Sequence, residues 1–146
     1  MIMNKEKIKL NIVELVSLIG SILYLIGIRI CFPVCKVTGD MIMSCHWAGE
    51  TLKALSVLIT GLAVIHILLR NYNMKVGIDI SLIGIYILTL NVPGRIISLC
   101  VKEGMTCRAK TMTMTIVFCV VLILLAAVDI FLCLSKEADT KHRRPN

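Results

Sequence analysis

Four long runs of apolar residues restrict the folds that this chain can adopt. They cover residues 11–30, 51–69, 75–92 and 111–134. About 20 apolar residues, each adding about 1.5 Å to a helix, cross a hydrocarbon core about 30 Å thick. Membrane strands would need alternating polarity, which these Ile, Leu and Val runs do not show. The pattern predicts an all-α integral membrane protein, with four transmembrane helices arranged as two hairpins in a single domain.

The third run is the least apolar of the four. It is slightly short and carries Asp79, and Pro93 with Gly94 ends it. An aspartate at the centre of a membrane helix costs about 2.5–3.5 kcal/mol on insertion scales. We therefore expect neighbouring helices to stabilise this span. The overall composition of 58% hydrophobic and 17% charged residues also argues against a water-soluble globule.

The N-terminal segment resembles the start of a signal peptide but lacks a cleavage site. Lys5, Lys7 and Lys9 precede the first apolar run, and no small-x-small motif follows it. We expect this run to be retained as the first span.

The distribution of basic residues and cysteines predicts the orientation. The two termini and the connection between the second and third spans carry slightly more Lys and Arg than the other two connections. This asymmetry favours cytoplasmic termini in a bacterial plasma membrane. The first and third connections instead concentrate cysteine, which suits an oxidising exterior. The basic tail, residues 135–146, would then face anionic lipid head groups. Nucleic-acid binding is disfavoured, because no basic face is interleaved with aromatic residues.

The two predicted outer loops share a motif. Each has Cys, three residues, Gly, and then Met, a hydroxyl residue, Cys and a basic residue. The first copy contains Cys35, Gly39, Met43, Ser44, Cys45 and His46, followed by Trp47; the second contains Cys100, Gly104, Met105, Thr106, Cys107 and Arg108. We interpret the motif as an internal repeat of two helical hairpins related by an axis along the membrane normal.

These paired Met-x-Cys motifs and the four-span layout resemble an uncharacterised family of small bacterial membrane proteins, domain of unknown function 4418. The resemblance covers nearly the whole chain. It implies no established activity. Members are often encoded beside an ATP-binding cassette transporter with a large-ectodomain permease, so the resemblance implies such a permease as a partner.

The loop cysteines leave three kinds of chemistry open. Cys35, Cys45, Cys100 and Cys107 allow three disulfide pairings, and a bridge within one loop would stabilise the fold by roughly 2–3 kcal/mol. Thiol–disulfide exchange is the second possibility, although the sequence has no Cys-x-x-Cys motif. Soft-metal binding of the copper type is the third, with Met and His beside the cysteines as ligands. We assign no catalytic residue, no metal and no cofactor.

Four ionisable residues lie within the predicted spans, near their cytoplasmic ends: Glu14, His66, Asp79 and Asp129. Their common depth predicts a polar layer, with Arg70 and Lys75 nearby. The layer could consist of side chains that pair at the interface. Alternatively, it could be a proton or cation site, or a contact for a charged partner helix.

Small residues form a stripe along the first span: Ser17, Gly20, Ser21 and Gly27. Such a stripe permits close helix approach, and its partner could be the fourth span, a second copy or another protein. The sequence favours a non-enzymatic accessory subunit of an ATP-binding cassette transporter. The alternatives are a membrane thiol–disulfide exchange protein or a soft-metal-binding membrane protein.

Overall fold

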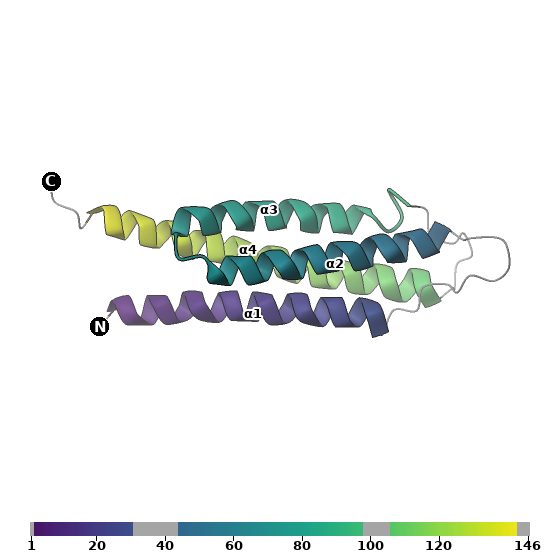
Figure 1. Cartoon of the computed structure of the whole chain (residues 1–146), viewed down its shortest axis with the longest axis horizontal. Coiled ribbons are helices and arrows are strands. Elements are labelled where there is room, and N and C mark those ends of the chain that lie inside the picture. The colour runs from purple at the N-terminus through teal and green to yellow at the C-terminus, as the bar shows by residue number, and fades with distance from the viewer. Residues whose placement is uncertain (1, 31–43, 98–105, 143–146) are drawn as a thin grey trace.

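The computed structural model describes residues 2–30, 44–97 and 106–142, with side chains for residues 11–30, 46–97 and 111–136. These residues form four helices: α1 (Ile2–Ile30), α2 (Ser44–Leu68), α3 (Tyr72–Asn91) and α4 (Thr106–His142). The helices lie side by side with alternating direction, and both termini lie at the same end of the bundle (Figure 1).

Each helix contains a segment long and apolar enough to cross a membrane: Asn11–Ile30, His46–Leu68, Tyr72–Asn91 and Thr111–Lys136. The prediction of an all-α chain with four such helices is confirmed. The third segment has the lowest mean hydropathy, 1.4, compared with 3.1 for the fourth.

Helices α1, α2 and α4 extend well beyond their predicted apolar runs. Helix α1 begins at Ile2 rather than near residue 11. Helix α2 begins at Ser44 rather than near residue 51, and α4 runs from Thr106 to His142, through most of the basic tail. The added segments contain polar and charged residues, for which hydropathy is a poor guide to helix ends. Ala, Lys and Glu, which favour helix, follow Ser135 in α4.

Helix α3 has well-defined ends. At its start, the Asn71 side chain accepts a hydrogen bond from the Asn73 backbone N–H at 3.2 Å, as an N-cap does. After Asn91 the chain turns at Pro93 and Gly94, as predicted. Gly94 has a φ of 94°, which a side chain would disfavour. The turn is closed by a hydrogen bond of 3.1 Å from the Ile97 N–H to the Val92 carbonyl.

The helices form a ring in which each packs on two neighbours. Helix α1 contacts α2 and α4, and α3 contacts α4 and α2, so α1 and α3 lie diagonally across the bundle. The buried positions on α3 and α4 alternate between spacings of three and four. On α4 they are Thr115, Cys119, Leu122, Ala126, Asp129 and Cys133. This spacing is typical of four-helix bundles with interlocking side chains.

The centre of the bundle combines large and very small side chains. Tyr24 and Tyr86 are fully buried there, and the ring of Tyr24 lies 5.7 Å from that of Phe118. A Cβ atom added to Gly20 would lie 3.1 Å from Leu122 Cδ2. Gly20, one of the small residues along the first span, therefore packs against the fourth span, which was one of the three possible partners.

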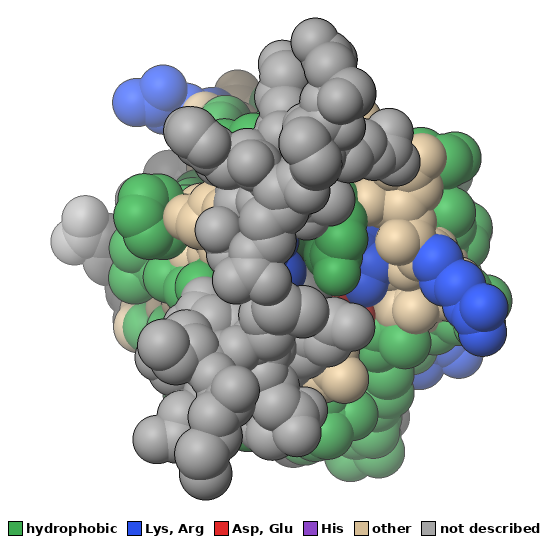
Figure 2. All heavy atoms as spheres, turned by 90° about the vertical axis from the view of Figure 1, so that its left-hand side faces the viewer, with side chains coloured by type: hydrophobic (Ala, Val, Ile, Leu, Met, Phe, Trp, Pro, Cys, Tyr) green, Lys and Arg blue, Asp and Glu red, His purple; other side chains and the backbone are tan. Residues whose placement is uncertain are grey.

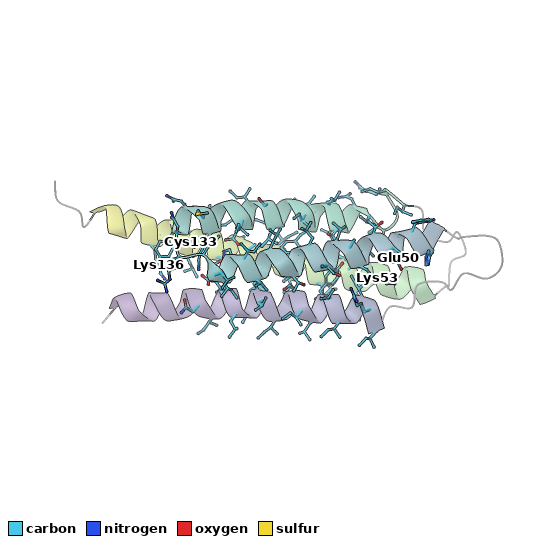
Figure 3. The ribbon with its side chains drawn as sticks, viewed as in Figure 1. Glu50, Lys53, Cys133 and Lys136 are labelled. Carbon is cyan, nitrogen blue, oxygen red and sulfur yellow. The ribbon has the colours of Figure 1, made fainter. Side chains whose placement is uncertain are left out.

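The outer surface of the bundle is apolar. Side chains point outward from the helices (Figure 3), and large hydrophobic ones are exposed on every helix. Leu124 and Phe131 on α4 are 61% and 71% exposed. Water would solvate such a surface poorly, whereas lipid chains solvate it well.

Candidate functional site

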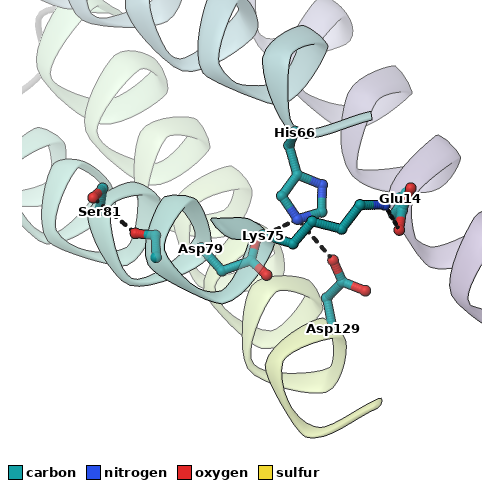
Figure 4. Close-up of polar contacts among 7 residues, drawn as sticks. Glu14, His66, Lys75, Asp79, Ser81 and Asp129 are labelled. Carbon is teal, nitrogen blue, oxygen red and sulfur yellow. Dashed lines mark hydrogen bonds and ion pairs between the residues drawn. The ribbon is translucent and has the colours of Figure 1, made fainter. Parts of the chain in front are cut away.

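Five charged or ionisable side chains from all four helices meet between the helices. We call them the ionic cluster: Glu14 of α1, His66 of α2, Lys75 and Asp79 of α3, and Asp129 of α4 (Figure 4). All five are buried, with at most 7% of any residue exposed. Buried charges at membrane depth are costly, so their presence here requires compensating partners.

The local structure explains why two helices deliver their cluster residues to the same place. Only residues 69–71 separate α2 from α3. His66 therefore lies in the last turn of α2, close to the start of α3. Lys75 and Asp79 are four residues apart and share one helix face, which Leu82 and Tyr86 continue into the core.

The cluster residues of the other helices occupy core positions in the same way. Asp129 follows Leu122 and Ala126 on the buried face of α4, and Glu14 precedes Ser21 and Tyr24 on that of α1. Each ionisable side chain thus points inward because its helix already faces the core at that position.

An ion pair links the two diagonal helices. Lys75 Nζ donates a hydrogen bond of 2.5 Å to Glu14 Oε1. Because α1 and α3 do not pack directly on each other, the long lysine side chain crosses the interior of the bundle to reach α1.

His66 lies between two aspartates. Its Nε2 atom is 3.2 Å from Asp79 Oδ1 and 3.2 Å from Asp129 Oδ2. One ring N–H cannot point at both oxygens. Within the described part of the chain, the remaining oxygens, Asp79 Oδ2 and Asp129 Oδ1, have no hydrogen-bond partner.

The charges of these five residues do not balance. The cluster has three carboxylates, one lysine and one histidine. Even with His66 protonated, one negative charge is left over. An uncompensated charge in a low-dielectric interior is strongly unfavourable. The cluster therefore needs a bound proton or an additional cation.

A small cavity adjoins these side chains. Its volume is about 10 Å³, and it is lined by Glu14, Ser17, Ala63, His66, Asp79, Leu82, Leu125, Ala126 and Asp129. A cavity of about 10–15 Å³ holds one water molecule. The space suits a single small species and excludes an organic substrate.

The loop motif largely lies outside the described residues. This holds for Cys35, Gly39, Met43, Cys100, Gly104 and Met105, and for the side chains of Cys45, Cys107 and Arg108. The disulfide bridges and loop chemistry therefore stay predictions. His46 and Trp47 lie in the first turn of α2 with ring centroids 6.2 Å apart, and Trp47 is 58% exposed. Cys119 and Cys133 are free and buried.

The structure brings Glu14, His66, Asp79 and Asp129 together, as their shared depth suggested. The sequence pattern predicts Lys75 near this layer but not as a member of it. The spacing could have predicted this membership, because Lys75 and Asp79 lie four residues apart. The sequence could not predict the partner of Lys75 on α1, because that contact depends on how helices far apart in the sequence pack.

Comparison with known proteins identifies the family of this chain but assigns it no function. No curated protein and no solved structure matches the chain. Residues 17–132 match the family described as "Domain of unknown function (DUF4418)". This segment covers α2 and α3 completely, most of the apolar segments of α1 and α4, and every cluster residue except Glu14. The chain therefore belongs to the DUF4418 family.

Proposed function

We propose that this protein is a non-enzymatic accessory subunit of a membrane transporter of the ATP-binding cassette type. The main support is an outward-facing line of small residues on α3, which we call the α3 stripe: Gly77, Ser81 and Gly84. All three are exposed, and a Cβ atom added to Gly77 or Gly84 would meet no atom within 4 Å.

The α3 stripe suits close contact with a helix of another membrane protein. Small residues let two helix backbones approach in lipid, where apolar burial alone provides no driving force. Gly20 shows the same principle inside this bundle, where it packs against Leu122. Ser81 Oγ donates a hydrogen bond to the Gly77 carbonyl at 2.9 Å, so the hydroxyl needs no hydrogen-bond partner from another helix.

The interior of the bundle favours a supporting role over transport by this chain alone. The cavity at the ionic cluster, about 10 Å³, has no room for a transported molecule much larger than water. The route for such a molecule would then belong to the partner. The partner class comes from the family resemblance.

The orientation and the loops complete the proposal. In a bacterial plasma membrane, the end with both termini would face the cytoplasm. Lys and Arg side chains stand on that face (Figure 2), in keeping with the positive-inside tendency. The most extensive helix contacts are those of α1 with α2 and of α3 with α4, which supports two hairpins. Disulfides would close the cysteine-containing loops at the opposite end.

Site-specific crosslinking tests the proposal. A photo-crosslinking residue replaces Ser81 in one variant and Leu124 in the other, and both are expressed in native membranes. Leu124 is a matched control because it is exposed on α4 among large apolar residues. We expect the Ser81 variant to crosslink to a transporter permease and the Leu124 variant not to. Crosslinks only to lipid or to a second copy of this chain would contradict the proposal.

Substitution of the α3 stripe provides a second measurement. Gly77→Leu and Gly84→Leu fill the stripe, and a Cβ atom at either position meets no other atom within 4 Å. We expect both variants to fold normally and to lose co-purification with the permease. Leu124→Phe should retain it.

A further inference from the structure

We propose that the ionic cluster binds one divalent transition-metal ion of the class that accepts imidazole and carboxylate ligands. Glu14, His66 and Asp129 would be the ligands, and Asp79, which contacts His66, would add negative charge beside them. This inference does not depend on the proposed transporter role.

The geometry is close to that of a metal site. One candidate ligand atom from each of Glu14, His66 and Asp129 lies within 4.8 Å of the others. An ion with ligand distances of about 2.0–2.2 Å holds opposite ligands at most about 4.4 Å apart. Side-chain shifts of less than about 1 Å would therefore close the site around an ion. The three ligands come from three different helices, so they converge from different directions (Figure 4).

The unpartnered atoms of the cluster point to a ligand. Asp79 and Asp129 are each 3% exposed and His66 is 4% exposed. Within the described residues, Asp79 Oδ2 and Asp129 Oδ1 have no hydrogen-bond partner, and His66 Nε2 contacts only the other oxygen of each aspartate. All three residues line the cavity, whose volume suits one small species. A bound cation would stabilise these carboxylate oxygens.

The charge of the cluster favours the same conclusion. Three carboxylates face one lysine and one histidine, so a divalent cation would offset the excess negative charge. Neutral imidazole is the form that binds metals. With His66 neutral, the side chains carry two uncompensated negative charges, equal in magnitude to the charge of the ion.

The ligand types limit the choice of metal. Imidazole with carboxylates suits zinc, manganese, iron, cobalt or nickel. Calcium and magnesium prefer oxygen ligands alone. The described residues that line the cavity include no cysteine or methionine, which disfavours Cu(I). This site is thus different in place and chemistry from the soft-metal site considered for the outer loops.

Substitution of Lys75 distinguishes a metal site from a cluster that only holds the helices together. Its ammonium group holds Glu14 Oε1 and so competes with a metal for that carboxylate. Replacing Lys75 with Met should free Glu14 and strengthen metal binding. A cluster that serves only to hold the helices together would be weakened by the same change and would bind no ion.

Titration with Co²⁺ tests the proposal. The full-length protein is purified in detergent, stripped with a chelator and titrated while its visible spectrum is recorded. We expect about one bound ion with nitrogen and oxygen ligands and no thiolate charge-transfer band. A variant with Ser at Cys35, Cys45, Cys100 and Cys107 should bind equally well, because those residues are not ligands. Loss of binding in that variant would overturn the proposal.

Substitutions within and outside the cluster complete the test. His66→Asn and Asp129→Asn should each weaken binding by more than about tenfold. Glu50→Gln, a change at an exposed carboxylate of α2, should have no effect. Lys75→Met should bind more tightly than the wild type, which keeps the test decisive if His66→Asn does not fold. Absence of a bound ion, unchanged affinity of folded His66→Asn, or weaker binding by folded Lys75→Met would each overturn it.

Discussion

Two Lys–Glu ion pairs, one at each end of the bundle, have similar lengths and very different surroundings. Lys75 and Glu14 lie 2.5 Å apart, with side chains 8% and 6% exposed. Lys53 and Glu50 lie 2.7 Å apart, with side chains 33% and 46% exposed. The first pair joins residues 61 positions apart in the sequence, and the second lies within a single turn of α2 (Figure 3).

The contrast shows that distance alone does not measure the contribution of an ion pair. At the exposed pair, water competes with the partner, and little is lost when the partner is removed. At the buried pair, removal of one partner leaves a charge that is largely shielded from water. The buried pair also links α1 to α3, whose backbones do not pack on each other.

The largest expected effect is at the buried lysine. Without bound metal, Lys75→Met should lower the free energy of unfolding by about 3–5 kcal/mol, because Glu14 is left uncompensated. Titration with SDS, followed by circular dichroism, measures this change. The double variant Lys75→Met with Glu14→Gln should regain most of the loss, because it removes both charges. A double variant as unstable as the single one would show that the uncompensated Glu14 charge does not cause the loss.

A smaller effect is expected at the centre of the bundle, where packing replaces charge. Leu122→Ala should cost about 2–3 kcal/mol, because Leu122 is almost fully buried. Gly20→Ala should cost about 1 kcal/mol, since its Cβ would crowd Leu122. In the Leu122→Ala background the Gly20 substitution should cost nothing. Additive costs in this double-mutant cycle would show that the two positions do not interact.

The smallest effect is expected at the exposed pair. Lys53→Met should leave the stability unchanged within the error of the same SDS titration, because exposed ion pairs contribute little. Lys53→Met is also the matched control for Lys75→Met, since both replace the same residue type in the same way. A loss as large as that of Lys75→Met would contradict the role assigned to burial.

Much of the fold followed from local features of the sequence. The number and approximate position of the spans depend on the length and polarity of each run. The stop after Asn91 depends on Pro93 and Gly94, whose backbone properties are also local. The start of α2 was predicted too late because Ser44–Glu50 is helical without being strongly apolar.

The candidate site was only partly predictable. Glu14, His66, Asp79 and Asp129 could be grouped because residues near the same ends of antiparallel spans share a depth. Their contacts, and the link from Lys75 to Glu14, depend on how each helix is rotated about its axis. The same rotation buries Gly20 against α4 and exposes Gly77 and Gly84.

The amino-acid sequence alone determined that this chain has four helices suited to a bilayer, because hydrocarbon solvation depends only on the length and polarity of each run. It also determined that ionisable residues lie near one end of the spans. Only the tertiary structure decided which of these side chains meet, which carboxylate oxygens are left without partners and which small residues face outward. These outcomes depend on contacts between helices far apart in the sequence, and the polarity of a single helix does not encode its neighbours.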